Sequence, residues 1–457
     1  MKQYDIIVIG AGSGGLVAAT TAHRKGLKTA LVEKNKIGGE CTHYGCIPSK
    51  AFINTAKTYH SISKMNALGI SIDLPKLDFG KIMEKVDEII QDIYENETPE
   101  IFQNQGIDVY VDKSGAQYTN DHTITIGEEI LQAKNFAICT GSSPRIPEIE
   151  GIELVNILHN ENFWSIRSHP GKIVFIGGGV ISVELGQSLA RLGCEVCIMD
   201  RNDRILKVTD KEIGTYLTQQ IEKEGVKLIT GATPLKFTKK NTMVYTLNNE
   251  ERTIKADYFF VAAGRLPKIN GMNLEKAGIT FTAKGITTNN YLQTSVQHIY
   301  ACGDVTTPFK FTHTASHQAN ICIENILKGN TESNDLSVLP WAIFTEPEIG
   351  HVGLSENGAQ EKYGNNNINV FKVDANIDRF VTDRKTGGML KVIFNSNDMV
   401  VGAEAVGALA GEWIQLLTLV IKNKIPAQQM ADTIFTYPSY SEIVKKAFSR
   451  YMRTKLV

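Results

Sequence analysis

Two cysteines separated by four residues are the first candidates for chemistry in this sequence. Cys41 and Cys46 stand between Gly38 and Lys50, and Gly45 directly precedes the second thiol. A locally distorted helix start at this glycine can bring the two sulfurs within bonding distance. A helix N-terminus and nearby cations lower the pKa of a thiol and favour the reactive thiolate. The alternative is two small buried side chains that form no disulfide.

The other cysteines are predicted to be structural. Cys194 and Cys197 lie on a predicted strand in which alternate side chains face opposite sides, so their thiols diverge. Cys139, Cys302 and Cys322 are scattered through the chain and are interpreted as core residues. An odd total of seven cysteines in so long a chain is not a disulfide framework, and in a reducing compartment it favours catalysis or metal binding at a close pair.

A glycine-rich turn near the N-terminus indicates binding of a pyrophosphate. It contains Gly10, Gly12, Gly14 and Gly15, lies between a predicted strand and a predicted helix, and is followed by a second strand that ends on Glu33. Backbone N–H groups at a helix start bind pyrophosphate, and the acid accepts hydrogen bonds from a ribose. A lone glycine match also fits an ordinary tight turn, but strand, helix and acid together favour a dinucleotide. The predicted elements are strand 5–9, helix 16–24 and strand 28–32.

The same plan recurs in the middle of the chain. Gly177 and Gly179 follow strand 172–176, and Ser182 stands where a third small residue is expected. A helix to residue 192 and strand 195–199 then lead to Asp200, at the same separation from the first glycine as in the first copy. Two such units imply two dinucleotides, one a tightly held flavin and the other a diffusible nicotinamide.

The residues after the second unit bear on which nicotinamide is used. Asp200 favours NAD, because a carboxylate repels the 2′-phosphate of NADP. Arg201 follows immediately, with Arg204 and Lys207 close behind, and these cations could accommodate that phosphate. NAD is therefore preferred over NADP only modestly.

The remaining organisation is that of a multidomain globular protein. Apolar residues at three- and four-residue steps predict one long helix over 81–103. From about residue 336 the pattern changes to an α+β domain, with strands 389–394 and 400–406 around a turn and an apolar helix over 411–421. A net charge of −1 excludes long-range attraction to nucleic acid or anionic membrane, and no apolar stretch approaches a membrane span. We expect a soluble, cytoplasmic protein.

Taken in order, these motifs make the whole chain resemble the class I pyridine nucleotide-disulfide oxidoreductases, the group that contains dihydrolipoamide dehydrogenase, glutathione reductase and mercuric reductase. The segments that carry the resemblance are Gly10 to Gly15, Gly39 to Lys50, Thr140-Gly141-Ser142, Gly177 to Glu184, Ala263 to Pro267, Tyr300 to Asp304 and Phe344 to Glu348.

The resemblance implies a role for each matched residue. Cys46 is the thiol that faces the flavin, and Cys41 is the interchange thiol that meets the acceptor. Lys50 and Glu184 form an ion pair beside the reactive nitrogen of the flavin, and Asp304 binds its ribityl chain. No metal site is predicted. The positions predicted to bind FAD or NAD(P) are Gly10, Gly12, Gly14, Gly15, Glu33, Gly39, Lys50, Ala116, Thr140, Gly141, Gly177, Gly179, Glu184, Asp200, Arg201, Gly264, Arg265, Gly303 and Asp304.

The resemblance also implies a fold and an assembly. The fold class is α/β, with two Rossmann-like dinucleotide-binding domains and a C-terminal α+β dimerisation domain. The FAD domain is expected to be discontinuous, over 1–148 and 270–335, with the NAD(P) domain inserted at 149–269 and the interface domain at 336–457. We expect a homodimer with each active site across the interface.

One segment departs from the disulfide-reducing members of the group. Tyr437 occupies the position of their catalytic histidine, Glu442 follows as their glutamate does, and no histidine occurs after His351. A phenol titrates near pH 10, which makes it a poor proton shuttle. Mercuric reductases also use tyrosine in this region, and thiolate sulfur suits a soft metal ion. His43, between the thiols, could be a local base or metal ligand, although such a residue is more often a polar loop histidine.

The acceptor therefore remains open between three hypotheses. A mercuric reductase-like or other soft-acceptor reductase is preferred. Dihydrolipoamide dehydrogenase is the alternative within the same enzyme class. The mercuric reductase pattern is not matched fully either, because the C-terminal cysteine pair of typical mercuric reductases is missing here. A redox-sensing flavoprotein without turnover is a third hypothesis, against which the retention of Lys50 and Glu184 argues.

Overall fold

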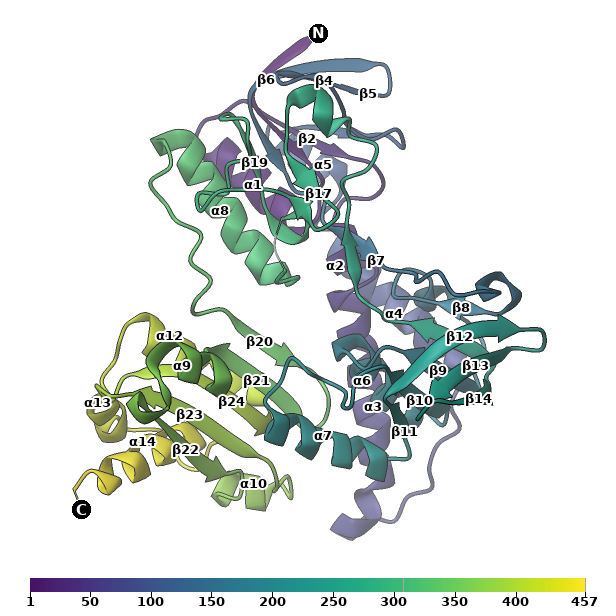
Figure 1. The fold of residues 1–457 in the computed structure, drawn as a ribbon, viewed down its shortest axis with the longest axis vertical. Helices are drawn as coiled ribbons and strands as arrows, with labels where there is room; N and C mark the ends of the chain where they lie inside the picture. The colour runs from purple at the N-terminus through teal and green to yellow at the C-terminus, as the bar shows by residue number, and fades with distance from the viewer. Residues whose placement is uncertain (307, 457) are drawn as a thin grey trace.

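Three bodies of secondary structure, which we call the first, second and third units, lie at the corners of a triangle (Figure 1). The computed structural model describes residues 1–306 and 308–456. The first unit, at the top of Figure 1, contains the N-terminus and also α8. The second unit lies at the lower right, and the third unit, with the C-terminus, at the lower left.

The first unit is built on a largely parallel sheet in the order β3-β2-β1-β6, with β5 and β19 both beside β6 and β4 beside β5. Residues Ile6 and Val8 of β1 face one core while Ile7 and Ile9 face another, as expected of a parallel strand covered on both sides. Its strands are β1 (Lys2–Ile9), β2 (Thr29–Glu33), β3 (Asp108–Val111), β4 (Gln117–Asn120), β5 (Thr123–Ile126), β6 (Glu129–Ile138) and β19 (Ile299–Ala301).

Helices α1 and α8 pack against each other on one face of this sheet. Small residues such as Ala18, Ala22 and Ala319 at their contact allow the close approach. The other elements of the first unit are short. The helices and short strands are α1 (Ser13–Arg24), α5 (Pro99–Asn104), α8 (Thr312–Lys328), the 3-10 turns η4 (Leu274–Ala277) and η5 (Gly303–Val305), and the ribbon β17 (Phe281–Thr282) with β18 (Gly285–Ile286).

The second unit is a five-stranded parallel sheet in the order β11-β10-β9-β15-β8, beside a three-stranded antiparallel sheet. A two-stranded ribbon, β7 (Ser142–Pro144) with β16 (Arg265–Pro267), joins it to the first unit. The elements are β8 (Ile157–Leu158), β9 (Lys172–Ile176), β10 (Glu195–Asp200), β11 (Lys227–Thr230), β12 (Ala232–Thr238), β13 (Thr242–Leu247), β14 (Glu250–Lys255), β15 (Tyr258–Val261), α6 (Val180–Arg191), α7 (Lys211–Lys223), η2 (Ile152–Leu154) and η3 (Phe163–Ser165).

The third unit is an antiparallel sheet in the order β20-β21-β24-β23-β22, covered by helices. Its core joins strand residues such as Leu390 and Val392 to Ile443 and Phe448 of α14. The elements are β20 (Pro340–Ile343), β21 (Glu348–Gly353), β22 (Ile368–Asp374), β23 (Met389–Asn395), β24 (Val400–Gly407), α9 (Glu356–Tyr363), α10 (Asp378–Thr382), α11 (Ala410–Trp413), α12 (Gln415–Lys422), α13 (Ala427–Asp432), α14 (Glu442–Thr454) and η6 (Asn365–Asn367).

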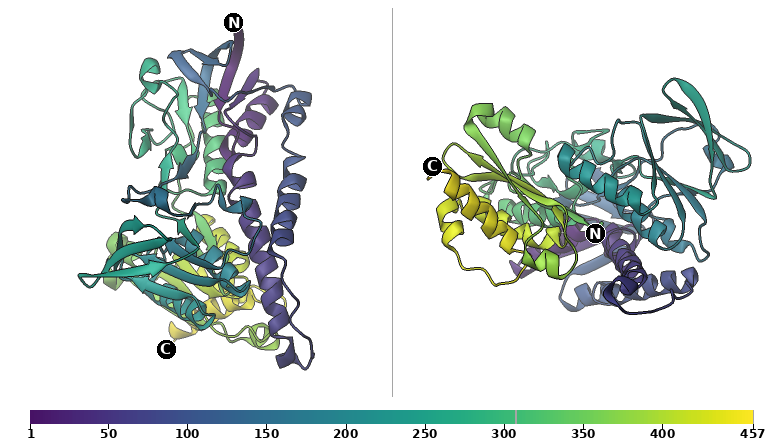
Figure 2. Two further views of the ribbon diagram at one scale, coloured as in Figure 1. Left: turned by 90° about the vertical axis from the view of Figure 1, so that its right-hand side faces the viewer. Right: turned by 90° about the horizontal axis from the view of Figure 1, so that it is seen from below.

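A pair of helices runs from the first unit down the side of the other two (Figure 2). They are α3 (Cys46–Ser63) and α4 (Phe79–Tyr94), preceded by the short α2 (Gly39–His43) and connected through η1 (Met65–Leu68). Phe52 of α3 and Met83 of α4 belong to the same buried cluster as Phe175 of the second unit and Ile343 of the third. This cluster joins the helix pair to the second and third units.

Three predicted helices are corrected by the structure. The helix expected over 81–103 ends at Tyr94, and a separate helix, α5, begins at Pro99. Proline disfavours the helical conformation in the residue before it, and Thr98 is extended, with ψ of 157°. The apolar helix expected over 411–421 is divided into α11 and α12 at Ile414. The helix predicted over 16–24 begins three residues earlier, at Ser13.

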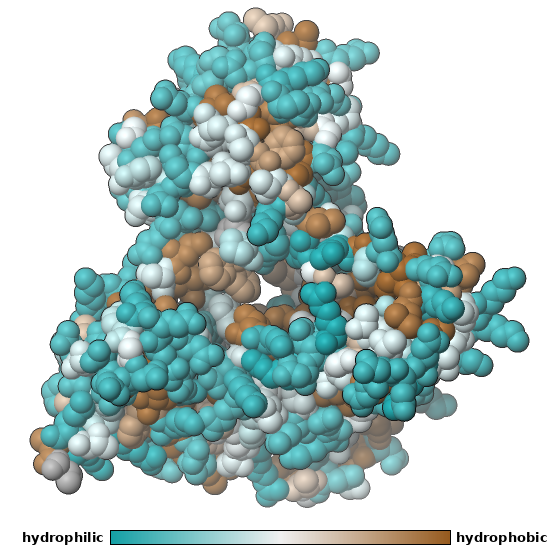
Figure 3. Space-filling view, in the orientation of Figure 1, coloured by the Kyte–Doolittle hydropathy of each residue, from teal (hydrophilic) through white to brown (hydrophobic). Residues whose placement is uncertain are grey.

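The surface of this face is mostly hydrophilic, with apolar side chains gathered around a central opening between the units (Figure 3). Among the described residues, no helix combines the length and apolar character needed to cross a membrane.

Candidate active site

The two cysteines lie at the junction of α2 and α3. Cys41 is on α2, and Cys46 is the first residue of α3, so the helix start predicted at Gly45 is present. Neither thiol is oxidised in this structure. The hydroxyl oxygen of Thr312 lies 3.3 Å from the sulfur of each cysteine. This residue begins α8, far along the chain, and sequence reasoning missed it because no local motif links it to the thiols.

The two thiols have opposite electrostatic environments. Interaction with Cys41, supported by Thr312 and the positive charge of Lys50, lowers the pKa of Cys46 to about 6 against the opposing effect of burial. The hydrogen bond to Cys46 and burial raise the pKa of Cys41. At neutral pH the arrangement therefore favours a thiolate at Cys46 and a protonated thiol at Cys41.

An ion pair connects α3 to the second unit behind the thiols. The ammonium of Lys50 lies 2.9 Å from a carboxylate oxygen of Glu184, which is on α6 and almost fully buried. The same ammonium lies 4.5 Å above the ring of Phe344, whose backbone N–H donates to the other oxygen of Glu184. The predicted pair is thus brought together, and it lies one helical turn after Cys46 along α3.

The first glycine turn forms a cradle from which side chains are excluded. Gly10 has φ of +98°, and a Cβ there would lie 2.5 Å from the carbonyl oxygen of Cys139. A Cβ at Gly15 would lie 1.7 Å from the carbonyl oxygen of Gly10. Gly39 has φ of +59°, and its Cβ would lie 2.7 Å from the Cα of Gly12, so α2 packs directly on the turn.

The cradle leaves the start of α1 open to an anion. Gly12 provides no side-chain cap, so the first N–H groups of the helix have no partner from the N-cap residue. One carboxylate oxygen of Glu33 accepts from the N–H of Ala11, and the other accepts from Lys34 and Asn35. The acid is therefore held at the edge of the turn, where a ribose next to a bound pyrophosphate lies. These features fit FAD.

The second glycine turn repeats this geometry with one change. Gly177 has φ of +110° and approaches the carbonyl oxygen of Ala262, as Gly10 approaches that of Cys139. The hydroxyl of Ser182, at the position of Gly15, donates to the carbonyl of Gly177. Asp200 accepts from the N–H of Gly178 with one oxygen and from Asn202 with the other. Gly179 provides no side-chain cap for α6. The site fits a second dinucleotide.

The other predicted positions collect at the carboxyl ends of β6 and β19 and along the connecting ribbon. Asp304 accepts a hydrogen bond of 2.6 Å from the hydroxyl of Ser142. The guanidinium of Arg265 donates to Ser142 and to the carboxylate of Glu40, and lies 3.8 Å from Asp304. This guanidinium is held by protein groups, and burial raises the pKa of Glu40 in spite of Arg265.

The glycines at these strand ends have backbone conformations that favour glycine. Gly141, Gly264 and Gly303 have φ of +71°, +108° and +78°. Thr140 donates from its hydroxyl to the carbonyl of Lys268. Ala116 is buried in the core beside the first sheet.

Comparison with known proteins identifies the family to which this chain belongs. The family described as pyridine nucleotide-disulphide oxidoreductase matches residues 4–319, and its dimerisation domain matches residues 339–448. This chain belongs to the pyridine nucleotide-disulphide oxidoreductases. The predicted enzyme class, cofactor class and fold are confirmed: the family is FAD-dependent and uses NAD(P)H, and its dimerisation domain implies a homodimer.

Individual relatives differ in their acceptors. The chain is 32% identical over 450 residues to the mercuric reductase of Staphylococcus aureus, with 97% of this chain and 82% of that protein covered. It is 32% identical over 456 residues to a dihydrolipoyl dehydrogenase of Bacillus subtilis (strain 168), with 97% and 96% covered. The Cu(II) complex of the HOCl-induced flavoprotein disulfide reductase RclA from Escherichia coli is 25% identical, with a TM-score of 0.87 and 98% and 100% covered. The chain is a flavoprotein disulfide oxidoreductase of the mercuric reductase and lipoamide dehydrogenase type.

Tyr437 and Glu442 of this oxidoreductase lie apart from its thiols within one chain. Tyr437 lies on the connection from α13 to α14, and Glu442 is the first residue of α14. The hydroxyl of Tyr437 donates to Asp378, which raises the pKa of the phenol, and 67% of the side chain is exposed. Glu442 accepts from the N–H of Ser439.

Two sequence hypotheses about secondary sites are decided by burial. His43 is buried, contacts the carbonyl oxygen of Ile37 at 2.7 Å and packs on Tyr94, so its ring is turned away from the role of a base at the thiols. Cys194 and Cys197 belong to two different buried clusters, which confirms that their side chains diverge. Burial raises the pKa of these thiols to about 12 and about 11.

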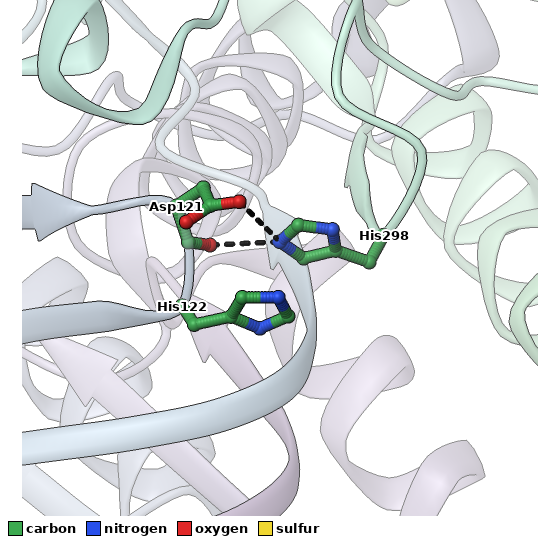
Figure 4. A group of neighbouring side chains, drawn as sticks. All are labelled: Asp121, His122 and His298. Carbon is green, nitrogen blue, oxygen red and sulfur yellow. Dashed lines mark hydrogen bonds and ion pairs between the residues drawn. The ribbon is translucent and has the colours of Figure 1, made fainter.

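One cluster with possible metal ligands lies elsewhere in the first unit (Figure 4). The rings of His122 and His298 stack in parallel with centroids 3.9 Å apart. The Nε2 atom of His298 lies 2.8 Å from the carbonyl oxygen of Asp121, and Nδ1 of His122 lies 2.9 Å from that of Ala133. Because imidazole lone pairs lie in the ring plane, parallel rings do not aim two nitrogens at one ion. The cluster ties the turn between β4 and β5 to the segment before β19.

Proposed function

We propose that this enzyme uses NADH to reduce a soft metal ion, such as Hg(II) or Cu(II), through the Cys41 and Cys46 pair. The observation that carries the proposal is an asymmetric thiol pair combined with a tyrosine where a proton-shuttling side chain would be needed for disulfides. When bound, FAD supplies the two-electron chemistry that connects the nicotinamide to the thiols. The family and the names of the relatives support electron transfer from the nicotinamide through FAD to the thiols.

The thiol pair suits a soft cation. A thiolate at Cys46 is the ligand form that binds soft metals, and Cys41 becomes a second thiolate when a metal displaces its proton. Thr312 contacts both sulfurs and orients them toward one another. Two electrons reduce Hg(II) to the metal, and no leaving thiolate has to be protonated. The mercuric reductase name of one group of relatives and the Cu(II) complex of RclA support this acceptor class.

Lys50 and Glu184 would position and tune the flavin side of the site. The ammonium adds positive charge near Cys46, and the buried carboxylate fixes the ammonium in place. We further propose that the FAD domain comprises 1–148 and 270–335, that the NAD(P) domain comprises 149–269 and that the interface domain comprises 336–457. Tyr437 and Glu442 would then reach the thiols from the partner subunit.

The acceptor is tested by steady-state NADH oxidation with Hg(II), Cu(II) and lipoamide. We expect turnover with the metal ions and low turnover with lipoamide. In Tyr437→His, lipoamide turnover should rise at least about tenfold, because an imidazole supplies the missing acid and base. Tyr437→Phe is the matched control, which removes the phenol without adding a base, and it should leave lipoamide turnover low. High lipoamide activity in the unmodified enzyme contradicts the metal-ion acceptor.

Dihydrolipoamide dehydrogenase is a second candidate. It is supported by the relative of that name in Bacillus subtilis, which is 32% identical over 456 residues and is covered over 96% of its length. The same assay separates the two activities, since this candidate requires rapid NADH oxidation with lipoamide as the acceptor.

We also propose a preference for NADH over NADPH. Asp200 occupies the ribose side of the second cradle with both oxygens anchored by backbone N–H groups. Of the three cations considered for a 2′-phosphate, Arg204 donates to the carbonyls of Leu206 and Thr209. Lys207 pairs with Asp203, and Arg201 is exposed. Two of the three cations are thus engaged elsewhere, while the repelling carboxylate is in place.

A further inference from the structure

A second pair of thiols lies inside the first unit. The sulfurs of Cys139 and Cys302 are 3.4 Å apart and buried. Cys139 directly follows β6 and Cys302 directly follows β19, which are parallel neighbours with Ile138 opposite Ala301. Matched positions on neighbouring strands have Cα atoms about 4.8 Å apart, within the range that a disulfide spans. The backbone therefore already has a geometry that permits a bond between these sulfurs.

A third cysteine lies beside this pair. Cys322 of α8 is fully buried and interacts with the sulfur of Cys302. Hydrogen bonds from Cys139 and Cys322 lower the pKa of Cys302, whereas the bond to Cys302 and burial raise the pKa of Cys139. The sulfur of Cys302 therefore has the greater thiolate character. As whole residues, Cys139 is 7% and Cys302 1% exposed, and the contact between their sulfurs is buried.

The pair lies directly beneath the first cradle. A Cβ added to Gly14 would lie 3.6 Å from the sulfur of Cys302, and one added to Gly15 would lie 3.5 Å from the Cβ of Cys139. Immediately after the two cysteines, the chain continues into Thr140-Gly141 and into Gly303-Asp304. Any change in the distance between these sulfurs is therefore transmitted to segments on both sides of the cradle.

We propose that Cys139 and Cys302 are an oxidation-sensitive thiol pair that closes to a disulfide beneath the dinucleotide cradle when a peroxide reaches it. The sulfur of Cys302 attacks the O–O bond of hydrogen peroxide, which gives a sulfenic acid and releases one water. The sulfur of Cys139 then displaces the hydroxyl group, which leaves as a second water with the proton of the Cys139 thiol. Two thiols lose two electrons and form one S–S bond, and one peroxide is reduced to two waters.

The disulfide holds the two strand ends beneath the cradle together. The sulfurs approach from 3.4 Å to about 2.05 Å, which ties the end of β6 to the end of β19. The bond closes a long loop, since the two residues are 163 positions apart, and cross-links of this kind restrict opening of the chain. We expect the oxidised protein to release its flavin more slowly than the reduced protein.

The proposal is tested in the FAD-loaded variant Cys41→Ser/Cys46→Ser, which removes the thiol pair at the active site and keeps five of the seven cysteines. After treatment with hydrogen peroxide, thiol titration in denaturant should show a loss of two thiols per chain. Mass spectrometry of a non-reduced digest should identify the peptides of Cys139 and Cys302 joined, and dithiothreitol should separate them. Flavin release from the oxidised protein should be slower by about threefold or more.

Two further variants act as matched controls in the same background. Cys322→Ala should still lose two thiols, whereas Cys139→Ala should form no such cross-link. A cross-link between Cys302 and Cys322, stable oxidation of Cys302 without a cross-link, or no loss of thiols overturns the assignment of the pair. An unchanged rate of flavin release in the cross-linked protein overturns the proposed effect of the disulfide on the cradle.

Discussion

At the scale of single residues, the candidate site depends on an asymmetry between two otherwise identical side chains. Cys41 and Cys46 are five positions apart, yet the first has a raised pKa and the second a pKa of about 6. The difference arises because Cys46 begins a helix, lies near Lys50 and receives the interaction with Cys41. Thr312 stands between the two and contacts both. This small polar group, supplied by another part of the chain, acts to lower the pKa of both thiols.

The depressed pKa of Cys46 predicts how the reduced enzyme reacts with iodoacetamide. Since only the thiolate reacts, alkylation of Cys46 should rise with pH around a midpoint near 6 and fall away below it. Thr312→Val should move this midpoint upward by about one pH unit, as expected for the loss of one hydrogen bond to a charged group.

The matched control is Thr314→Val, two residues along α8. The hydroxyl of Thr314 is buried without a hydrogen-bond partner among the described residues, so removing it should leave the midpoint unchanged. Equal midpoints in all three proteins would show that the Thr312 hydroxyl does not tune the thiols.

The nucleotide preference is also a residue-scale prediction. Asp200→Ala removes the carboxylate that repels a 2′-phosphate and leaves Arg201 beside the ribose position. We expect the ratio of kcat/KM for NADPH to that for NADH to rise by about tenfold, which corresponds to ~1.4 kcal/mol. Glu195→Ala, on an exposed position of the same strand, is the control and should leave the ratio unchanged. A native enzyme that already prefers NADPH contradicts the proposal directly.

At the scale of elements, each cofactor cradle combines a helix start that has no side-chain cap with glycines that have no side chain. Helices α1 and α6 both begin without a side-chain cap, and Gly10 and Gly177 at the start of the two turns leave no room for a Cβ. Gly39 of α2 packs on Gly12 and closes one side of the first cradle. The helix with Cys41 is therefore positioned by the same backbone that would bind FAD, and this explains why the thiols follow the first dinucleotide unit so closely along the chain.

Two alanine variants should separate the fold of the cradle from its occupancy. Gly15→Ala places a Cβ 1.7 Å from the carbonyl of Gly10, so the protein should unfold at a lower temperature even without FAD. Gly12→Ala meets no atom closer than 4.0 Å, so its apoprotein should keep the unmodified Tm while its FAD content falls severely. Thermal melts and flavin absorbance measure both quantities. Full flavin content in Gly12→Ala would mean that the pyrophosphate does not occupy this space.

At the scale of the whole molecule, a buried ion-pair network joins the second unit to the third. The guanidinium of Arg191, at the end of α6, contacts both oxygens of Glu224 at 2.7 Å and a carboxylate oxygen of Glu346 at 2.9 Å. Its side chain is only 2% exposed. Burial tends to raise the pKa of Glu346, but Arg191 and Lys385 lower it below its ordinary value. The network helps to hold the third unit in place beside α6.

Removing the cation at the centre of this network should be costly. Arg191→Met leaves two carboxylates without their buried partner, and we expect a loss of about 3–5 kcal/mol in stability, seen as a lower Tm. Because the pKa of Glu346 is depressed in the folded protein, its contribution is present above its unfolded pKa and is lost as the pH falls through the folded value. The variant should therefore lose much of this acid sensitivity.

An exposed pair provides the control. Arg252→Met breaks a surface contact with Glu250 and should change stability by less than ~1 kcal/mol. Comparable losses in the two variants would show that burial of the Arg191 network adds nothing.

Features that depend only on neighbouring residues could be predicted from the sequence. The strand, glycine turn, helix and acid of each dinucleotide unit could be predicted because each is a local pattern of backbone freedom and apolar period. The distorted helix start between Cys41 and Cys46 was predicted for the same reason. Local patterns also set the limit: the apolar period over 81–103 continued past Tyr94, and the start of a new helix at Pro99 overrode it.

The tertiary structure alone decided which distant groups meet. The contact of Thr312 with both thiols, and that of Cys139 with Cys302, each join residues more than a hundred positions apart. No local pattern specifies such contacts, because they depend on β19 returning to pair with β6 and on α8 packing over α1. Strand order and helix packing are properties of the closed fold, and they place Thr312 at the active-site thiols and Cys139 beside Cys302 beneath the first cradle.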